Sequence, residues 1–213
     1  MRFVFGSVLA LSLFLGLTGS WESASARDGA LEQSDRLARR TARASEDIDR
    51  FVARLDRTER ALEALSEAQG KNLRPRYQSF TKQVKNLEAA EKVARSHIHE
   101  MKATGVQYAS SWDAENAKIV NPELRQASVD RRAARMKEYE ELGATLNEIE
   151  GRIRPFMGNL RDLGAFLGVD LSRDHVRTAA DAIQKSQEDA QTLKKSIAPV
   201  QARLRQFRND APR

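Results

Sequence analysis

Large apolar residues recur at alternating intervals of three and four positions along most of the chain. The clearest example lies in residues 139–167, where the apolar positions are Tyr139, Leu142, Leu146, Ile149, Ile153, Phe156, Leu160, Leu163 and Leu167. A repeat of about 3.5 residues is typical of a helix that packs against other helices. A lone helix would leave such a stripe in water, so the pattern predicts neighbouring helices.

Three further segments, residues 37–65, 73–112 and 176–207, carry apolar stripes of the same kind. The connections between the four segments are short, which favours antiparallel packing of successive helices. We therefore predict an all-α fold, an elongated antiparallel bundle of four long helices with coiled-coil-like seams. The alternatives are a pair of longer coiled-coil hairpins or a dimer that completes the core.

Capping residues and proline predict where the helices begin and bend. Asp28, Asn72, Asn121 and Ser172 each precede a predicted helix and can cap it. The last of these caps a single fourth helix, which we expect Pro199 to bend near its end. Pro155 lies inside the third segment, where the apolar stripe continues in phase, so we expect a kink there rather than a break.

The N-terminus has the composition of a secretory signal peptide. Arg2 supplies a positive charge, residues 3–17 are apolar, and Ala24-Ser25-Ala26 matches an A-x-A cleavage site. We expect a signal peptide over residues 1–26, one helical domain over residues 27–208 and a frayed tail over residues 209–213. The apolar stretch is short for a membrane-spanning helix, which needs about 20 residues, but an uncleaved anchor is the alternative.

The chain of 213 residues contains no cysteine. A lipoprotein anchor needs a cysteine at the cleavage point, so we expect no such anchor. An exported protein without disulfides depends on packing alone, and long helices that bury leucines provide it. These features predict an exported bacterial protein that is periplasmic or associated with the cell envelope.

The net charge is +6, and the basic excess is concentrated in residues 71–120. A basic balance favours acidic partners, of which nucleic acid is the least expected for an exported protein. Cations of the second segment that lie off the seam are candidates for contact with anionic lipid or envelope polysaccharide. They are Lys82, Lys85, Lys92, Arg95 and Lys102.

A second row of cations lies along one flank of the first segment. It consists of Arg36, Arg40, Arg43, Arg50, Arg54 and Arg57. Guanidinium groups pair bidentately with phosphate, so the row could bind anions. The interpretation we favour is an exposed face with ion pairs four residues apart, namely Glu32–Arg36, Asp35–Arg39, Glu46–Arg50 and Asp56–Arg60.

Glu91 occupies a seam position where an apolar residue is expected. It could be a general acid with a raised pKa or a buried partner of an arginine. More often such a residue sets the register or faces a splayed part of a bundle. His97 and His99 lie on different sides of a helix, whereas shared metal ligation needs a spacing of three or four. We expect no catalytic residue, no cofactor and no metal.

Several short motifs in the second half of the chain resemble a known family. In order, they are Trp112-Asp113-Ala114-Glu115, residues 121–125 with Ser128, Tyr139, Arg154-Pro155-Phe156 and Leu160-Arg161-Asp162. The pattern is similar to a bacterial family of exported proteins catalogued as domain of unknown function 2959. The resemblance implies a helical, exported, uncharacterised protein and lends no catalytic residues. Members typically continue with a leucine-lysine-histidine-asparagine turn, from which residues 166–171 depart.

The sequence therefore favours an exported structural or interaction protein without catalysis. Its long amphipathic helices would meet protein partners or a second copy of the chain. The alternative is an anion-binding module that docks on lipid or polysaccharide through the basic second helix.

Overall fold

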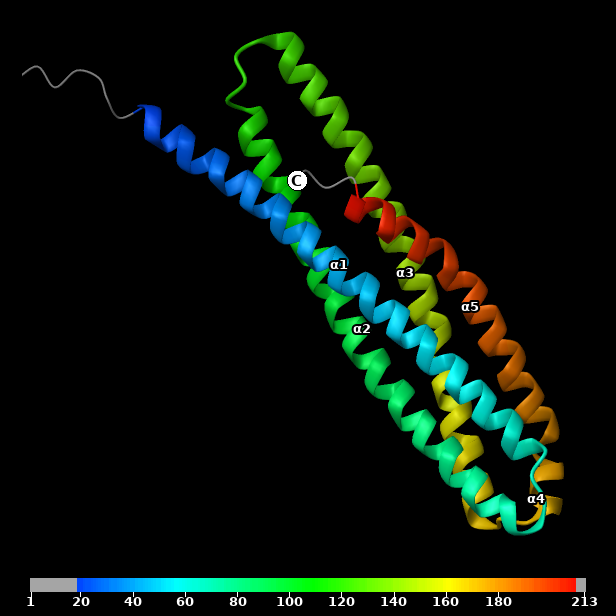
Figure 1. Cartoon of the computed structure of the whole chain (residues 1–213). Coiled ribbons are helices and arrows are strands. Elements are labelled where there is room, and N and C mark those ends of the chain that lie inside the picture. Colours follow the sequence, from blue (N-terminus) through cyan, green and yellow to red (C-terminus); the bar gives the residue numbers. More distant parts are fainter. Residues whose placement is uncertain (1–18, 210–213) are drawn as a thin grey trace, which may run out of the picture.

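The computed structural model describes the backbone of residues 19–209 and the side chains of residues 32–207. Every secondary-structure element in this part of the chain is a helix (Figure 1). The elements are α1 (Gly19–Ser66), the 3₁₀ helix η1 (Gly70–Asn72), α2 (Leu73–Asn116), α3 (Pro122–Val169), α4 (Arg173–Thr178) and α5 (Ala180–Asn209). The predicted all-α class is confirmed.

The four long helices form an elongated antiparallel bundle (Figure 1). Helix α1 lies against α2 and α5, and α3 lies against the same two helices. A single chain thus surrounds its own core with four helices, as predicted, rather than forming two long separate hairpins. The packing is uneven, because α1 and α2 contact each other far more extensively than α2 and α3 do.

The apolar stripes predicted from the sequence form this core. In α1 every predicted seam position is buried, from Leu37 to Leu65. In α3 the seam stays in phase across Pro155, and its residues are buried except for the half-buried Tyr139 and Ile153. Each fully buried large apolar side chain stabilises the fold by about 1.5–3 kcal/mol relative to an exposed one.

Two helix starts use the predicted capping side chains. Asn121 Oδ1 accepts a hydrogen bond from the backbone N–H of Leu124 at 3.0 Å, and Ser172 Oγ accepts one from the N–H of His175 at 3.2 Å. Asn72 makes no such bond, so the predicted cap at that position was wrong. The reason is that η1 leads directly into α2, so that Asn72 has helical geometry, with φ −83° and ψ −14°, instead of the extended geometry of a capping residue.

The fourth predicted helix is in fact two helices, α4 and α5. Ala179 separates them with φ −86° and ψ 1°, which interrupts the helical geometry. The sequence predicted a single helix over this segment, and the break at Ala179 corrects that prediction. The apolar stripe still crosses the junction, since Ala179 and Ile183 are both buried.

Helix α4 carries an arginine that closes the end of α1. The guanidinium of Arg173 donates hydrogen bonds to the carbonyls of Ser66 at 2.7 Å and Ala68 at 3.0 Å. The last carbonyls of a helix lack partners within the helix, and a cation there also complements the helix dipole. The separate turn of α4 thus ties the beginning of the last segment to the end of the first.

Two glycines are required by local geometry. Gly70 has φ +53°, a conformation that glycine adopts without strain, and lies between α1 and α2. At Gly168 a Cβ atom would lie 2.6 Å from the hydroxyl oxygen of Tyr77. That hydroxyl donates to the carbonyl of Gly164 at 3.0 Å, so a small residue at position 168 lets α2 and α3 approach closely at this end.

The start of α1 differs from the prediction, because the helix runs without interruption from Gly19 rather than beginning near Asp28. Residues 1–18 and 210–213, which include most of the predicted signal peptide and frayed tail, lie outside the described residues. Among the residues that are described, no helix is both long and apolar enough to cross a membrane.

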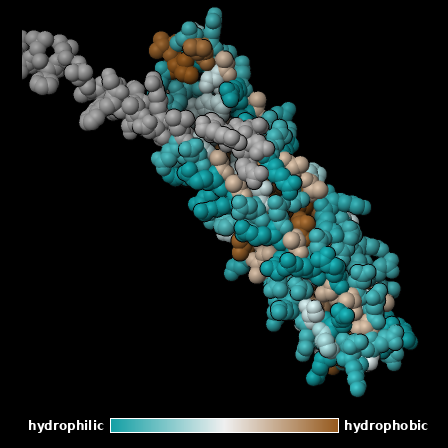
Figure 2. Space-filling model, viewed as in Figure 1, coloured by the Kyte–Doolittle hydropathy of each residue, from teal (hydrophilic) through white to brown (hydrophobic). Residues whose placement is uncertain are grey.

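The visible surface of the bundle is mainly hydrophilic (Figure 2). Hydrophobic residues gather at the end formed by the α2–α3 connection, where Val120 and Leu124 are exposed. Elsewhere the large exposed apolar side chains are scattered singly, which is normal for a protein surface.

Candidate functional site

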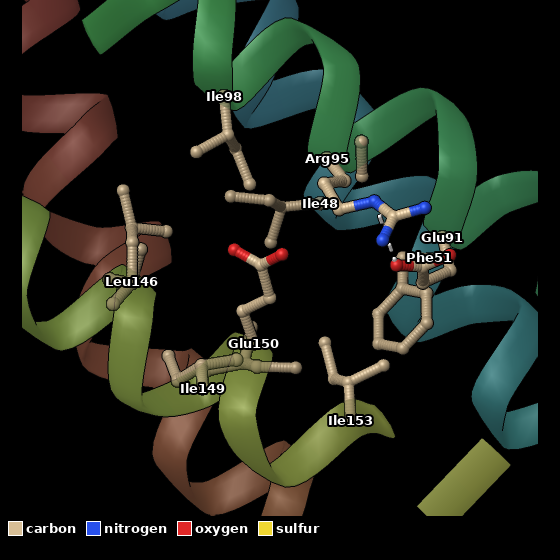
Figure 3. Close-up of a pocket in the computed structure, with 12 residues that line it drawn as sticks. Ile48, Phe51, Glu91, Arg95, Ile98, Leu146, Ile149, Glu150 and Ile153 are labelled. Carbon is tan, nitrogen blue, oxygen red and sulfur yellow. Dashed lines mark ion pairs between the residues drawn. The ribbon is translucent and has the colours of Figure 1, made fainter. Parts of the chain in front are cut away.

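The bundle core opens sideways in a cleft between α2 and α3 (Figure 3). All four long helices contribute to its wall, which is mostly apolar. The cavity at its base has a volume of about 50 Å³. The lining residues are Ile48, Phe51, Glu91, Ala94, Arg95, Ile98, Leu146, Ile149, Glu150, Ile153, Ile197 and Val200.

The sequence explains why the core is open at this level. Glu91 occupies a seam position of α2, and a carboxylate placed in a closed apolar core without a partner would cost several kcal/mol. The helices stay apart here, so that the Glu91 side chain keeps about a fifth of its surface exposed. Ala94, one turn further along α2, is too short to fill the space. Ile98 and Ile153 on the facing helices consequently remain only half-buried.

Charged side chains from both helices form the rim of the cleft. From α2, Glu91 pairs with Arg95 at 3.4 Å, and both lie on the same wall (Figure 3). From α3, the carboxylate of Glu150 extends across the opening and lies 3.7 Å from His99 Nε2. The apolar interior is thus bordered by two acids and a guanidinium within the opening itself.

Lys102 of α2 lies one turn beyond the cleft and contacts α3 there. Its Nζ donates to Asn147 Oδ1 at 2.6 Å, which links α2 to α3. Partial burial lowers the pKa of Lys102, and the negative charge of Glu150 opposes that effect. The ammonium group therefore links the two helices at the surface of the bundle.

A shallow groove continues from the cleft along α2 and α3. It is lined by Glu88, Glu91, Lys92, Arg95, Glu150, Ile153, Arg154, Met157 and Arg161. Arg161 Nε pairs with Glu88 at 2.7 Å and closes the far end of the groove. The cleft and the groove together form one depression with apolar residues along its floor and both signs of charge on its sides.

The structure separates the five predicted anion-contact residues into two groups. Lys82, Lys85 and Lys92 are exposed, and none of them has an ion-pair or hydrogen-bond partner in the described part of the chain. Arg95 and Lys102 instead face α3 and bond with Glu91 and Asn147, respectively. Arg95 and Lys102 therefore have partners within the bundle, and contact of the five residues with an anion stays a prediction.

The histidines lie in different environments, as their spacing indicated. His97 Nδ1 pairs with the buried Asp47 of α1, which also accepts from Arg50. His99 faces α3, and the ring of His175 stacks on Phe166 with centroids 4.1 Å apart. No group of three or more metal-ligating side chains occurs among the residues whose positions are described.

Three of the residues that carried the family resemblance, Trp112, Asp113 and Ser128, link α2 to α3 near their connection. Trp112 Nε1 donates to Ser128 Oγ at 3.1 Å, and Ser128 in turn bonds Asn116 Oδ1. Arg132 of α3 pairs with Asp113 of α2. These contacts link two helices, and the carboxylate of Asp113 is paired with the guanidinium of Arg132.

Sequence reasoning found Glu91 but missed Glu150, the other acid of the cleft. Glu150 follows the seam residue Ile149 by one position and therefore looked like an ordinary solvated residue. Because α2 and α3 are splayed, that position points into the opening (Figure 3). The only signal in the sequence was the anomaly at Glu91, which does not show which residue of α3 lies opposite.

Comparison with known families gives one match, to the family described as "Protein of unknown function (DUF2959)", over residues 27–208. The match covers most of the chain, including the first two helices, and the chain belongs to this family. No curated protein and no solved structure matches it. The family resemblance seen in the second half of the sequence is thereby confirmed and extended to the whole helical region.

Proposed function

We propose that this member of an uncharacterised family is a non-catalytic interaction protein whose α2/α3 cleft receives a helix of a protein partner. The observation that carries the proposal is the lateral opening of the apolar core between α2 and α3. Apolar side chains that are left accessible in a groove between two helices suit helix-in-groove recognition. The mechanism is the presentation of a rigid surface, with no bond made or broken.

The cavity at the base of the cleft is the size of a protein side chain. A volume of about 50 Å³ holds a few water molecules or one small apolar group. A partner helix needs to insert only one apolar side chain into the cavity, while its neighbouring residues lie along the groove.

The charges on the rim indicate which charges the partner helix carries beside its apolar stripe. Glu91 and Glu150 offer negative charge, and Arg95 and the exposed Arg154 offer positive charge. A helix with an apolar stripe flanked by residues of both signs complements this arrangement. A second copy of the chain and a different protein both satisfy this description.

We also propose that the chain is exported, is cleaved after Ala26 and acts in the periplasm or at the envelope. The apolar residues 3–17 and the A-x-A motif support export. The match to the family begins at Arg27, the residue after the expected cleavage site, which supports the same boundary.

A second candidate function is docking on an anionic lipid or polysaccharide surface. The observation that favours it is the absence of partners for the exposed Lys82, Lys85 and Lys92 within the described residues. Lys92 also lines the groove that continues from the cleft, so the two candidate surfaces adjoin each other.

Filling the cavity tests the docking proposal. Ala94→Val adds two carbon atoms at the buried wall, so we expect the stability of the chain to stay level or rise by up to about 1 kcal/mol. Cross-linking of a partner polypeptide by a photoreactive residue at Arg154 should be lost in the same variant. The matched control is Ala144→Val on the exposed surface of α3, which should leave cross-linking unchanged.

The outcome that contradicts the proposal is persistent cross-linking at full yield in the Ala94→Val chain. Absence of any cross-linked polypeptide in cells whose chain keeps Ala94 and carries the photoreactive residue at position 154 would contradict it equally. A cross-linked second copy of the chain would identify the partner as the protein itself.

A further inference from the structure

We propose that a groove between α3 and α5, here called the α3/α5 groove, binds a short peptide with free termini and apolar side chains. The groove lies at the α4 end of the bundle (Figure 1), and its cavity has a volume of about 410 Å³. Pockets that bind small molecules typically measure about 300–1,000 Å³. No residue lines both this groove and the α2/α3 cleft, so the inference does not depend on the function proposed for the cleft.

Small residues on the last segment leave the groove open. Ala179, at the junction of α4 and α5, and Ser186 lie on the apolar stripe of this segment, where larger residues would reach α3. Both are buried, and with the buried Leu163 of α3 they form the base of the groove. Ala182 of α5 and Phe166 of α3 line the groove and are exposed, so the groove is open to solvent above a largely apolar base.

Charged and polar side chains line the groove from both helices. Asn159 and Asp162 of α3 are exposed, and neither has a hydrogen-bond or ion-pair partner among the described residues. Lys185 lines the groove from α5, and its Nζ lies 3.6 Å from Asp189, with 68% of the lysine side chain exposed. An exposed ion pair of this length contributes little, so the ammonium group can pair with a ligand instead.

The two charges indicate a ligand that is itself charged at both ends. Asp162 and Phe166 are one turn apart on α3, so an ammonium group that pairs with the carboxylate also lies near the aromatic ring. Lys185, on the other helix, attracts a carboxylate. The apolar base between them suits an uncharged middle with apolar side chains.

The hydrogen-bonding groups of the groove favour a peptide over other molecules with two charged ends. Ser186 Oγ donates to the carbonyl of Ala182 at 2.8 Å, and Thr178 Oγ donates to the carbonyl of Asp174 at 3.0 Å. Each hydroxyl hydrogen is therefore used, and each oxygen can accept a hydrogen bond from an N–H group of a ligand. The side-chain amide of Asn159 offers a donor and an acceptor, which complement the carbonyl and N–H of a peptide group.

Calorimetric titration of the full chain with the tripeptide leucyl-alanyl-leucine tests the proposal. The same peptide is also titrated with its N-terminus acetylated and, separately, with its C-terminus amidated. We expect the unmodified peptide to bind and each modification to weaken binding by about threefold to fivefold. Losses of this size are expected because pairs between exposed charges are screened by solvent.

Two charge variants assign the ends of the peptide to the two sides of the groove. Lys185→Gln should weaken binding of the unmodified peptide by about threefold to fivefold and leave binding of the amidated peptide unchanged. Asp162→Asn should do the same to the unmodified peptide and leave the acetylated peptide unchanged. A change that merely disturbed the structure would affect the modified and unmodified peptides alike.

A steric variant tests whether the peptide occupies the groove itself. Ala182→Leu places a larger side chain at an exposed position in the groove, so binding of all three peptides should weaken by about 10-fold or more. The matched control is Ala134→Leu, at an exposed position of α3 outside the groove, which should leave binding unchanged. Circular dichroism confirms that each variant keeps its helices.

Three results would overturn the proposal. The first is no measurable binding of the unmodified tripeptide to the natural chain. The second is an equal effect of Lys185→Gln on the unmodified and the amidated peptide, because the lysine would then not contact the carboxylate. The third is tighter binding of a peptide blocked at both ends, which would assign the groove to an internal segment of a longer polypeptide.

Discussion

Replacing Phe80 by alanine is expected to lower the free energy of unfolding by about 3–5 kcal/mol. Phe80 of α2 is 0% exposed and packs near Gly164 of α3, where a Cβ atom would lie 3.8 Å from the phenylalanine ring. Removing the ring leaves a cavity at the end of the bundle where α2 and α3 approach most closely. Urea unfolding followed by circular dichroism measures the loss.

Phe166→Ala is the matched control, because it removes the same atoms from a side chain that is 39% exposed. Phe166 stacks on His175 at the surface of the bundle, so the expected cost is about 1 kcal/mol or less. Equal losses in the two variants would contradict the assignment of Phe80 to the core and the exposure of Phe166. The comparison tests the packing register of α2 against α3.

Replacing His97 by leucine is expected to destabilise the chain by about 2 kcal/mol, although leucine is the more apolar residue. Asp47 has only 4% of its side chain exposed, and His97 and Arg50 are its partners. Loss of the histidine leaves a buried carboxylate that Arg50 alone compensates, and an underpaired buried charge is costly. The partly exposed position of Arg50 limits what that arginine can offset.

A second substitution reveals the cause of this loss. In the Asp47→Ala/His97→Leu chain the unpaired carboxylate is gone, so we expect the double variant to be more stable than His97→Leu alone by about 1 kcal/mol or more. Urea unfolding of both single variants and the double variant completes the cycle. A loss of stability in the double variant that equals the sum of the two single losses would show that the two residues act independently of each other.

The sequence could predict most of the fold because its main signal is local and repeated. The seam from Leu37 to Leu65 repeats at a period that only packed helices satisfy, and every one of its predicted positions is buried. Asn121 and Ser172 mark helix starts through side-chain chemistry that acts within three residues. Predictions of this kind need no knowledge of the rest of the molecule.

Two predictions about helix boundaries failed, one because of a distant contact and one because of the element next to it in the chain. The turn between α4 and α5 accompanies the bonding of Arg173 to carbonyls of α1 more than a hundred residues away. Asn72 could have capped α2 but precedes it in helical geometry, because η1 runs directly into that helix. Neither the Arg173 contact nor the 3₁₀ turn before α2 produces a periodic pattern in the sequence.

In the candidate site, too, the local features could be predicted from the sequence and the contacts between helices could not. Glu91 was visible as an acid in an apolar stripe, yet the residues that face it depend on how far α2 and α3 splay. The ion pairs of the first helix were predicted for residues four apart, and Glu32–Arg36 and Glu46–Arg50 form. Asp56 instead bonds Lys194 of α5, which sequence spacing alone does not indicate.

Protection of a single introduced cysteine tests the central proposal, docking in the cleft, most directly. The natural chain has no cysteine, so Arg154→Cys on the rim and Arg131→Cys elsewhere on exposed α3 each carry one reporter thiol. In the purified protein the thiols of both variants should react with a maleimide at similar rates. In intact cells we predict that the reaction of the Arg154→Cys variant slows by about 10-fold or more while that of the Arg131→Cys variant does not. Equal reaction of the two variants in cells would contradict docking in the cleft.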